Sequence, residues 1–236
     1  MMASQAPRST YDHHRDRLAA YFDGTARKAW IDLTSDAKVG GIRATVRAGR
    51  DRMRTMLLDW LPQDLRRTSL LDAGCGTGAL SGQAACRGAE VTAVDIAAGL
   101  VAIARERTPS FLGHGRIDWH VGDMLDPALG RFDHIVAMDS LIHYPLDEMV
   151  ATIAALADRC ERSIAFTFAP HTTLLGVMHG IGQFFPRGNR SPALVPVAED
   201  ALRRRLETLP GWEIARSERV VSGFYTSHAI ELVRRG

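Results

Sequence analysis

The chain has 236 residues, of which 46% are hydrophobic, 24% charged and 7% aromatic. These values match ordinary globular proteins, so we expect one folded domain with an appendage and exclude disordered, collagen-like and coiled-coil chains. No uncharged apolar run reaches the roughly 18 residues of a membrane span, and the first residues contain no apolar stretch typical of a secretory signal. The three cysteines form no CxxC pair, which predicts reduced thiols and a cytoplasmic location.

The net charge of +2 is unevenly distributed along the chain. Residues 1–67 carry 13 Lys and Arg against 8 Asp and Glu, residues 68–170 carry 7 against 13, and residues 171–236 carry 9 against 6. An acidic middle between basic flanks indicates ligands of opposite charge on different parts of the chain. A chance scatter of solvated charges explains the same counts equally well.

The first predicted elements in chain order are helices within residues 1–67. Apolar residues recur at helical spacing at positions 18, 19, 21 and 22, and again at 53, 56, 57, 60 and 61. These helices precede the first strand, so we expect them to form an arm or lid over one edge of a sheet. We therefore divide the chain into a helical N-terminal arm (1–67) and a second unit (68–236).

Short apolar segments then alternate with helical ones. The segments are almost continuously apolar, as in a parallel sheet that is covered on both faces. Alternation with helices predicts βαβ units and a doubly wound sheet. The predicted strands are 69–74, 90–96, 117–123, 132–140 and 163–169, and the predicted helices are 77–87, 97–108 and 146–160.

The C-terminal part of the chain follows a different pattern. An insertion at 171–198, with an apolar helix at 174–185, precedes a last helix, and two strand-like runs at 212–221 and 224–235 flank Ser222-Gly223, a hairpin signal. The predicted fold class is therefore α/β: a doubly wound, mostly parallel seven-stranded sheet with a C-terminal antiparallel hairpin and the helical N-terminal arm.

A glycine-rich segment, LLDAGCGTGAL (70–80), joins the first predicted strand to the next helix. Glycine at these positions lets a ligand lie against bare backbone. The spacing also fits the G-x-G-x-x-A pattern of dinucleotide-binding folds. Asp72 argues against a dinucleotide, because its charge would repel a pyrophosphate and attract an amino group.

Four successive strands end in aspartate, at Asp72, Asp95, Asp123 and Asp139. Open α/β sheets bind ligands at the carboxyl edge, where these side chains are expected to meet. There Asp95 can accept both hydroxyls of a ribose, and Asp123 can accept from the exocyclic amine of an adenine. Helix capping is the alternative for any single aspartate, but it explains all four together poorly.

The segments 72–78, 94–95, 122–124 and 132–140 resemble the class I S-adenosylmethionine (SAM)-dependent methyltransferases, which have a Rossmann-like fold. The resemblance implies SAM as methyl donor, and no cluster of His and Cys in the sequence suggests a protein-bound metal. It places Asp72 and Gly74 beside the methionine part, Asp95 at the ribose, Asp123 and the Met124 backbone at the adenine, and Asp139 and Ser140 at the sulfonium. The cofactor-binding set it implies is Asp72, Gly74, Cys75, Gly76, Gly78, Asp95, Ile96, Gly122, Asp123, Met124, Asp139 and Ser140.

Three further segments, 21–30, 141–149 and 168–186, resemble the magnesium-protoporphyrin IX O-methyltransferases of chlorophyll and bacteriochlorophyll biosynthesis in photosynthesis. The resemblance implies methylation of a porphyrin propionate, with magnesium carried by the substrate. It also implies magnesium chelatase or other enzymes of the tetrapyrrole pathway as partners. The sequence departs from the family pattern at Asp23-Gly24, where many members have Asn-Ser, and at His171, where Lys is frequent.

The residues themselves agree with a porphyrin acceptor. The apolar helix 174–185 suits a flat tetrapyrrole, and Arg187 and Arg190 suit its two propionates. A propionate is already ionised at pH 7, so the enzyme must supply alignment and exclusion of water rather than a strong base. We expect His143 to hydrogen-bond the reacting carboxylate or take its residual proton, and Tyr21 to donate its hydroxyl from the arm. A loop histidine bonded to backbone and a core tyrosine are the structural alternatives.

Two other functions remain open at this point. A small-molecule O-methyltransferase of the quinone or phenol type would use His143 as a base. A non-catalytic SAM-binding regulatory protein would not need all four aspartates. A nucleic-acid partner is not expected, because the chain has no long basic stripe with interleaved aromatic residues and no N/D-P-P-Y motif after the fourth strand. Apolar pathway products and the basic flanks predict peripheral membrane contact.

Overall fold

A computed structural model of the chain describes residues 10–24, 34, 40–171 and 194–236. The described residues form one seven-stranded sheet in the order β3-β2-β1-β4-β5-β7-β6, and β7 is antiparallel to both of its neighbours. The strands are β1 Ser69–Ala73, β2 Glu90–Asp95, β3 Arg116–Val121, β4 Phe132–Ala137, β5 Cys160–Phe168, β6 Trp212–Ser222 and β7 Tyr225–Arg234.

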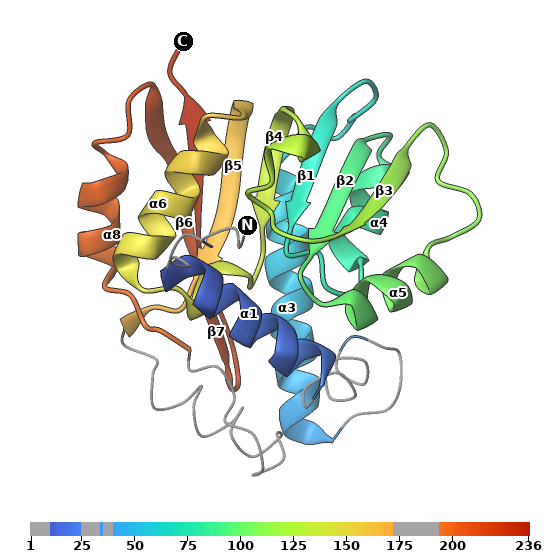
Figure 1. Cartoon of the computed structure of the whole chain (residues 1–236), viewed down its shortest axis with the longest axis horizontal. Coiled ribbons are helices and arrows are strands. Elements are labelled where there is room, and N and C mark those ends of the chain that lie inside the picture. The colour runs from blue at the N-terminus through green and yellow to red at the C-terminus, as the bar shows by residue number, and fades with distance from the viewer. Residues whose placement is uncertain (1–9, 25–33, 35–39, 172–193) are drawn as a thin grey trace, which may run out of the picture.

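Helices cover both faces of this sheet, with α6 and α8 in front of it and α3 behind it in Figure 1. The helix α1 crosses below the sheet, near the carboxyl ends of the parallel strands. The α-helices are α1 Thr10–Asp23, α3 Gly41–Trp60, α4 Ala79–Cys86, α5 Ala98–Arg107, α6 Leu146–Ala157 and α8 Glu199–Leu206, and the short helices are η1 Pro127–Leu129 and η2 Leu141–His143.

The predicted fold class is confirmed, and the element ends differ from prediction for local reasons. The helix expected from residue 77 begins at Ala79, because Gly78 caps it in the left-handed conformation at φ 81°. The helix expected to reach residue 160 ends at Ala157, since Cys160 already pairs with Phe132 of β4. The division of the chain at residue 67 stays a prediction.

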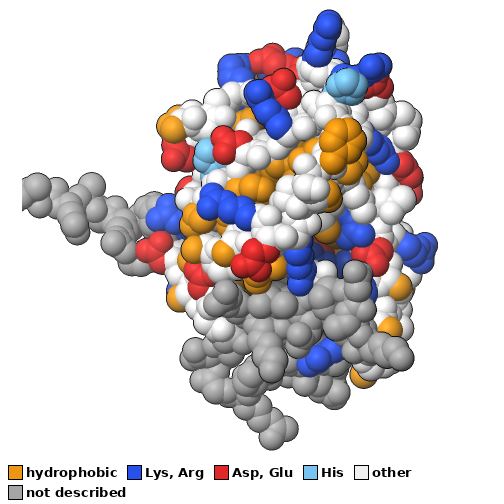
Figure 2. Space-filling model, turned by 90° about the vertical axis from the view of Figure 1, so that its right-hand side faces the viewer, with side chains coloured by type: hydrophobic (Ala, Val, Ile, Leu, Met, Phe, Trp, Pro, Cys, Tyr) orange, Lys and Arg blue, Asp and Glu red, His pale blue; other side chains and the backbone are white. Residues whose placement is uncertain are grey.

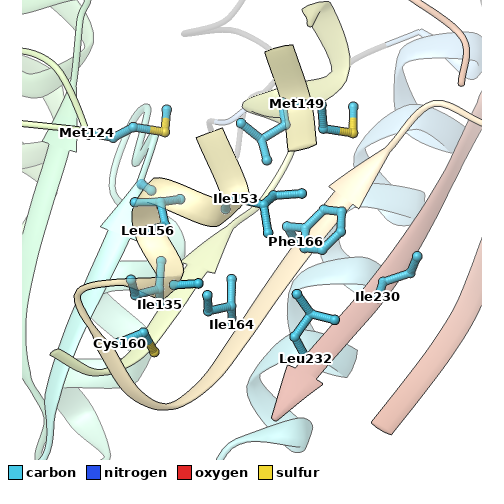
Figure 3. Packing of buried hydrophobic residues seen from close by; sticks show 14 of the residues in the cluster. Met124, Ile135, Met149, Ile153, Leu156, Cys160, Ile164, Phe166, Ile230 and Leu232 are labelled. Carbon is cyan, nitrogen blue, oxygen red and sulfur yellow. The ribbon is translucent and has the colours of Figure 1, made fainter. Parts of the chain in front are cut away.

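Alternate residues of the central strands enter different hydrophobic clusters, as a sheet buried on both faces requires. Ile135 packs on the α6 side and Val136 on the α3 side. On the α6 side, side chains of the helix meet those of β4, β5 and β7 (Figure 3). The labelled residues of this cluster are Met124, Ile135, Met149, Ile153, Leu156, Cys160, Ile164, Phe166, Ile230 and Leu232.

The helix α3 is seated on the turn of the C-terminal hairpin. A Cβ at Gly49 would lie 2.5 Å from Cδ1 of Tyr225, and one at Gly223 would lie 2.5 Å from Oγ1 of Thr45. The hydroxyl of Ser222 donates to the carbonyl of Thr45 at 2.9 Å. Glycine at these two positions therefore allows a close approach that fixes the position and rotation of α3.

The surface on the β3 side carries charged side chains of both signs around a band of hydrophobic ones (Figure 2). Phe111 and Val121 are the exposed large hydrophobic residues of this part of the chain, at 80% and 51% exposure. No helix among the described residues is long and apolar enough to cross a membrane.

Candidate functional site

A cavity of about 340 Å³ opens at the carboxyl edge of the sheet, between α1, α3 and the ends of β1, β2 and β4. This volume is within the range of sites for one small ligand. All of the predicted site residues except Gly78 and Tyr21 line it. The predicted residues in its wall are Asp72, Gly74, Cys75, Gly76, Asp95, Ile96, Gly122, Asp123, Met124, Asp139, Ser140 and His143.

The glycine-rich loop is shaped by neighbours on both sides. Gly74 has φ 87°, and a Cβ there would overlap the Cβ of Ser140. Gly78 has φ 81°, and a Cβ there would overlap the ring of Trp119. Gly78 therefore shapes the start of α4 through close packing, without facing the cavity, whereas Gly74 brings the loop against the end of β4.

Asp72 lines the cavity and is only 2% exposed. Its carboxylate accepts a short hydrogen bond from the hydroxyl of Ser81 in α4. Burial, with a smaller contribution from the charge of Asp95, raises the pKa of Asp72 to about 7 against the opposing effect of the hydrogen bond from Ser81. A buried carboxylate of this kind is stabilised in its ionised form by a cation placed beside it.

Asp95 closes β2 and supports the glycine-rich loop through its side chain. One carboxylate oxygen accepts from the backbone N–H of Gly76 at 2.8 Å, and the other accepts from that of Ala97 at 2.9 Å. Burial raises the pKa of Asp95, and these backbone donors counteract that effect. The carboxylate thus has a fixed orientation in the cavity wall before any ligand binds.

Asp123 connects the third strand to α1. Its Oδ1 accepts from the N–H of Leu125 at 2.8 Å, and its Oδ2 accepts from the guanidinium of Arg15 at 3.0 Å. Farther along α1, Asp23 accepts from the N–H groups of Ala98 and Gly99 at the start of α5, at 3.1 and 2.7 Å. The middle of α1, at Arg15, and its last residue, Asp23, are therefore attached to the part of the sheet edge where β2 and β3 end.

Asp139 has a left-handed backbone, with φ 54°, and turns the chain out of β4 toward Ser140. Its side chain, 7% exposed, accepts from the hydroxyl of Tyr225 at 3.1 Å and lies 3.4 Å from the guanidinium of Arg50. Thr167 accepts from the backbone N–H of Asp139 at 2.7 Å. Through its backbone and its carboxylate, Asp139 therefore joins α3, β5 and β7 at the cavity.

His143 enters the cavity from η2 and is 7% exposed. Its ring centre lies 5.8 Å from that of Phe22, which lines the cavity from α1. Tyr21 is also buried and meets Phe22 edge to face, with ring centres 5.3 Å apart. The structure therefore brings His143 into the cavity and places Tyr21 behind Phe22, outside the lining.

The residues present fit SAM. A side chain at Gly76 or Gly122 would meet no atom within 4 Å, and both glycines line the cavity, so the wall leaves space against bare backbone. Carboxylates face this space from several strand ends, as a ligand with ammonium, sulfonium and ribose groups requires. Among the described residues, no group of three or more His, Cys, Asp or Glu side chains could hold a metal ion.

The comparisons with known proteins agree with this geometry. A family model described as the magnesium-protoporphyrin IX methyltransferase C-terminus matches residues 137–234, and a general methyltransferase-domain model matches residues 70–162. A magnesium-protoporphyrin O-methyltransferase of Rhodobacter capsulatus is 46% identical over 224 residues, which cover 94% of this chain and 98% of the relative. The chain belongs to the magnesium-protoporphyrin O-methyltransferase family.

A second member of this family, from Synechocystis, is 32% identical over 91% of this chain and 94% of its own length. The crystal structure of the Synechocystis magnesium-protoporphyrin IX methyltransferase with bound S-adenosylhomocysteine (SAH) superimposes with a TM-score of 0.81 at 30% identity. That match covers 94% of this chain and all of the other. Membership in the magnesium-protoporphyrin O-methyltransferase family favours the first of the three functions that the sequence left open.

Some wall residues of this family member were not anticipated from its sequence. Phe22 and Leu18 contribute from α1, and Arg47, Arg50 and Arg54 contribute from α3. The sequence does indicate that the three arginines lie together, because their spacing puts them on one helix face. The apolar helix at 174–185 and the basic residues Arg187 and Arg190 fall outside the described residues.

Proposed function

We propose that this chain transfers the methyl group of SAM to a propionate carboxylate of magnesium-protoporphyrin IX, giving the monomethyl ester in chlorophyll or bacteriochlorophyll biosynthesis. The main observation behind the proposal is that one cavity is lined by carboxylates at successive strand ends, by His143 and by Phe22. The family of the chain supports the same acceptor.

In this proposal the carboxylates hold SAM by its charges and hydroxyl groups. Asp72 and the Gly74 backbone bind the methionine part, Asp95 binds the ribose, and Asp123 with the Met124 backbone binds the adenine. The raised pKa of Asp72 supports its part in the proposal, because an ammonium group would stabilise the ionised carboxylate. In this proposal Asp139 lies farther from SAM than the other three carboxylates, since its own carboxylate already contacts Arg50 and Tyr225.

The reaction needs little acid or base chemistry. Bound SAM supplies an electrophilic methyl group; an oxygen of the propionate forms the new bond to it, and the electron pair of the broken C–S bond stays on sulfur. No proton is consumed when the propionate is ionised, as it is at pH 7. The protein therefore contributes mainly by aligning the two reactants and excluding water, effects that supply roughly 7–11 kcal/mol when the alignment is good.

His143 orients the reacting carboxylate by a hydrogen bond and accepts its proton when the acid form binds. Phe22 and Tyr144, which line the same cavity, exclude water from the reacting atoms. Tyr21 supports this wall through its edge-to-face contact with Phe22. Its direct donation to the substrate carboxylate, the role inferred from sequence, stays a prediction.

The proposal also includes peripheral membrane contact and transfer of the substrate from magnesium chelatase or another enzyme of the tetrapyrrole pathway. The basic segments at both ends of the chain and the apolar substrate support membrane contact. Co-sedimentation with vesicles of anionic lipid, compared with neutral vesicles, tests it. The membrane proposal is wrong if the full chain stays in the supernatant with both.

The main test is to incubate the purified chain with SAM and magnesium-protoporphyrin IX and to identify the product by mass spectrometry. We expect one methyl group to be added to the porphyrin and an equal amount of SAH to be formed. A parallel reaction with a catechol or a hydroxylated quinone tests the rival acceptor class. Methylation of the phenol without ester formation would overturn the proposal.

A further inference from the structure

We propose that Arg159 is a positioning residue for the adenine of SAM, acting through the loop that carries Asp123 and Met124; this rests on the placement of adenine proposed above. Arg159 is half-buried and lies between the end of α6 and the start of β5, and it is not among the described residues that line the cavity. Its guanidinium contacts the loop that follows β3 (122–130), in which Gly122, Asp123 and Met124 do line the cavity.

Two nitrogens of the Arg159 guanidinium donate to two backbone carbonyls of this loop. One makes a short hydrogen bond to the carbonyl of Asp126, and the other donates to the carbonyl of Met124 at 2.7 Å. Because a guanidinium is planar and rigid, this pair of hydrogen bonds fixes both carbonyls relative to α6. The side chain of Met124 packs in the same hydrophobic cluster as Leu156 of α6 (Figure 3), so both the backbone and a side chain hold the loop against the helix.

The hydrogen bond to Met124 has a direct effect on Asp123. The peptide group between Met124 and Leu125 is planar and trans, so its C=O and its N–H point in opposite directions. The C=O accepts from Arg159, and the N–H donates to Oδ1 of Asp123 at 2.8 Å. Polarisation of this peptide group by the cation strengthens the hydrogen bond that its N–H makes. Arg159 thus sets the orientation of the Asp123 carboxylate through one intervening peptide group.

The main chain holds Arg159 itself in a fixed place. Its N–H donates to the carbonyl of Leu156 at 3.0 Å, and its carbonyl accepts from the N–H of Phe132 in β4 at 2.9 Å. Burial lowers the pKa of Arg159, against the charges of Asp126 and Asp123, which favour the cation. A permanently charged group is therefore partly removed from water at a point where its two hydrogen bonds to the loop end on neutral carbonyls. These hydrogen bonds fix the geometry of the loop rather than neutralise a charge.

A second arginine connects the same parts of the chain at a different point. Arg131 follows the loop, donates to the carbonyl of Asp158 at 2.9 Å and contacts the carboxylate of Glu161 at 2.8 Å. Loss of Arg131 therefore weakens the attachment of α6 to the start of β4. Loss of Arg159 weakens this attachment and also releases the peptide group that holds Asp123.

The test compares the affinities of the full chain for SAH and for S-inosylhomocysteine, both measured by calorimetry. In the second compound a carbonyl oxygen replaces the exocyclic amine of adenine, so it presents an acceptor to Asp123 where SAH presents a donor. The unchanged protein should therefore prefer SAH. We expect Arg159→Gln to weaken binding of SAH about 10-fold and binding of the inosine analogue about 2-fold or less. Arg159→Lys should keep only part of the preference, because lysine has the charge but not the planar pair of donors.

Arg131→Gln is the matched control, since it removes the same charge from the same junction and should leave the preference for SAH unchanged. Thermal denaturation of each variant separates the two roles: a purely structural role of Arg159 would lower the melting temperature and leave the preference as it is. The proposal is overturned if Arg159→Gln leaves the preference unchanged, if Arg131→Gln lowers it equally, or if the unchanged protein has no preference. If Arg159→Gln does not fold, an unchanged preference in Arg159→Lys overturns the proposal instead. These measurements need no porphyrin and no turnover, so their outcome is independent of the test of the methyl-transfer reaction.

Discussion

The substitution Asp72→Asn separates two effects of Asp72, one on the stability of the fold and one on the affinity of the protein for SAM. Asp72 is 2% exposed, and burial raises its pKa from the ordinary 3.8 to about 7. The folded state therefore holds this proton more tightly than the unfolded chain does. Its contribution to the free energy of unfolding is complete below about pH 4 and is lost as the pH rises toward 7.

The expected magnitude follows from these two pKa values. Their difference corresponds to about 4 kcal/mol at roughly 1.4 kcal/mol per pH unit, of which about 3 kcal/mol falls between pH 5 and pH 8. The asparagine side chain of the variant has nearly the same shape, still accepts from the hydroxyl of Ser81 and does not ionise. The free energy of unfolding of the variant, relative to the unchanged protein, should therefore rise by about 3 kcal/mol from pH 5 to pH 8.

The assay is denaturation by urea at the two pH values, without SAM, with SAH affinity measured in parallel. At pH 8 the variant should bind SAH about 10- to 100-fold more weakly, because it lacks the charge proposed to hold the ammonium group. Asp133→Asn is the control, since hydrogen bonds from Ser69 hold the pKa of Asp133 below its ordinary value, so it does not titrate in this range. A stability difference for Asp72→Asn that stays constant from pH 5 to pH 8 would refute the reasoning.

Three further predictions concern two residues that line the cavity and one glycine in the loop beside it. His143→Ala should lower turnover about 100-fold and leave SAH affinity unchanged; an equal loss of both would contradict its assigned role. Gly78→Ala should lower the free energy of unfolding by about 3 kcal/mol, because φ is 81° and the added Cβ overlaps Trp119, whereas Gly82→Ala, where a Cβ meets nothing within 4 Å, should be neutral or stabilising. Asp95→Asn replaces an oxygen that accepts a backbone N–H by an NH₂ group, so SAH affinity should fall at least about 10-fold in calorimetry, and unchanged affinity would show that the carboxylate is not needed.

Much of the fold was predictable because its signals are local. The apolar runs fixed the strands, the Ser222-Gly223 pair marked the hairpin turn, and the glycine-rich loop identified the edge where ligands bind. Most of the predicted cofactor residues do line one cavity, because the carboxyl ends of parallel strands must meet there whatever the details of packing.

The parts that sequence reasoning missed depend on contacts between distant segments. Asp139 was assigned to the sulfonium, but nothing local reveals that Tyr225 and Arg50 contact its carboxylate. Tyr21 was expected in the site, and its neighbour Phe22 lines the cavity instead, because a one-residue change on a helix turns the side chain by about 100°. Pattern alone identifies the helix but not its rotation against the sheet.

The insertion of β7 between β5 and β6 has a consequence for the chain during its synthesis. Tyr225, which donates to Asp139 and against which Gly49 packs, belongs to β7, the strand of this sheet that leaves the ribosome after the other six. Until then α3 lacks its contacts with the C-terminal hairpin, and the wall that it contributes to the cavity is missing. An emerging chain therefore has no complete site through which SAM could stabilise it, and binding of the methyl donor reports that the entire sheet has assembled.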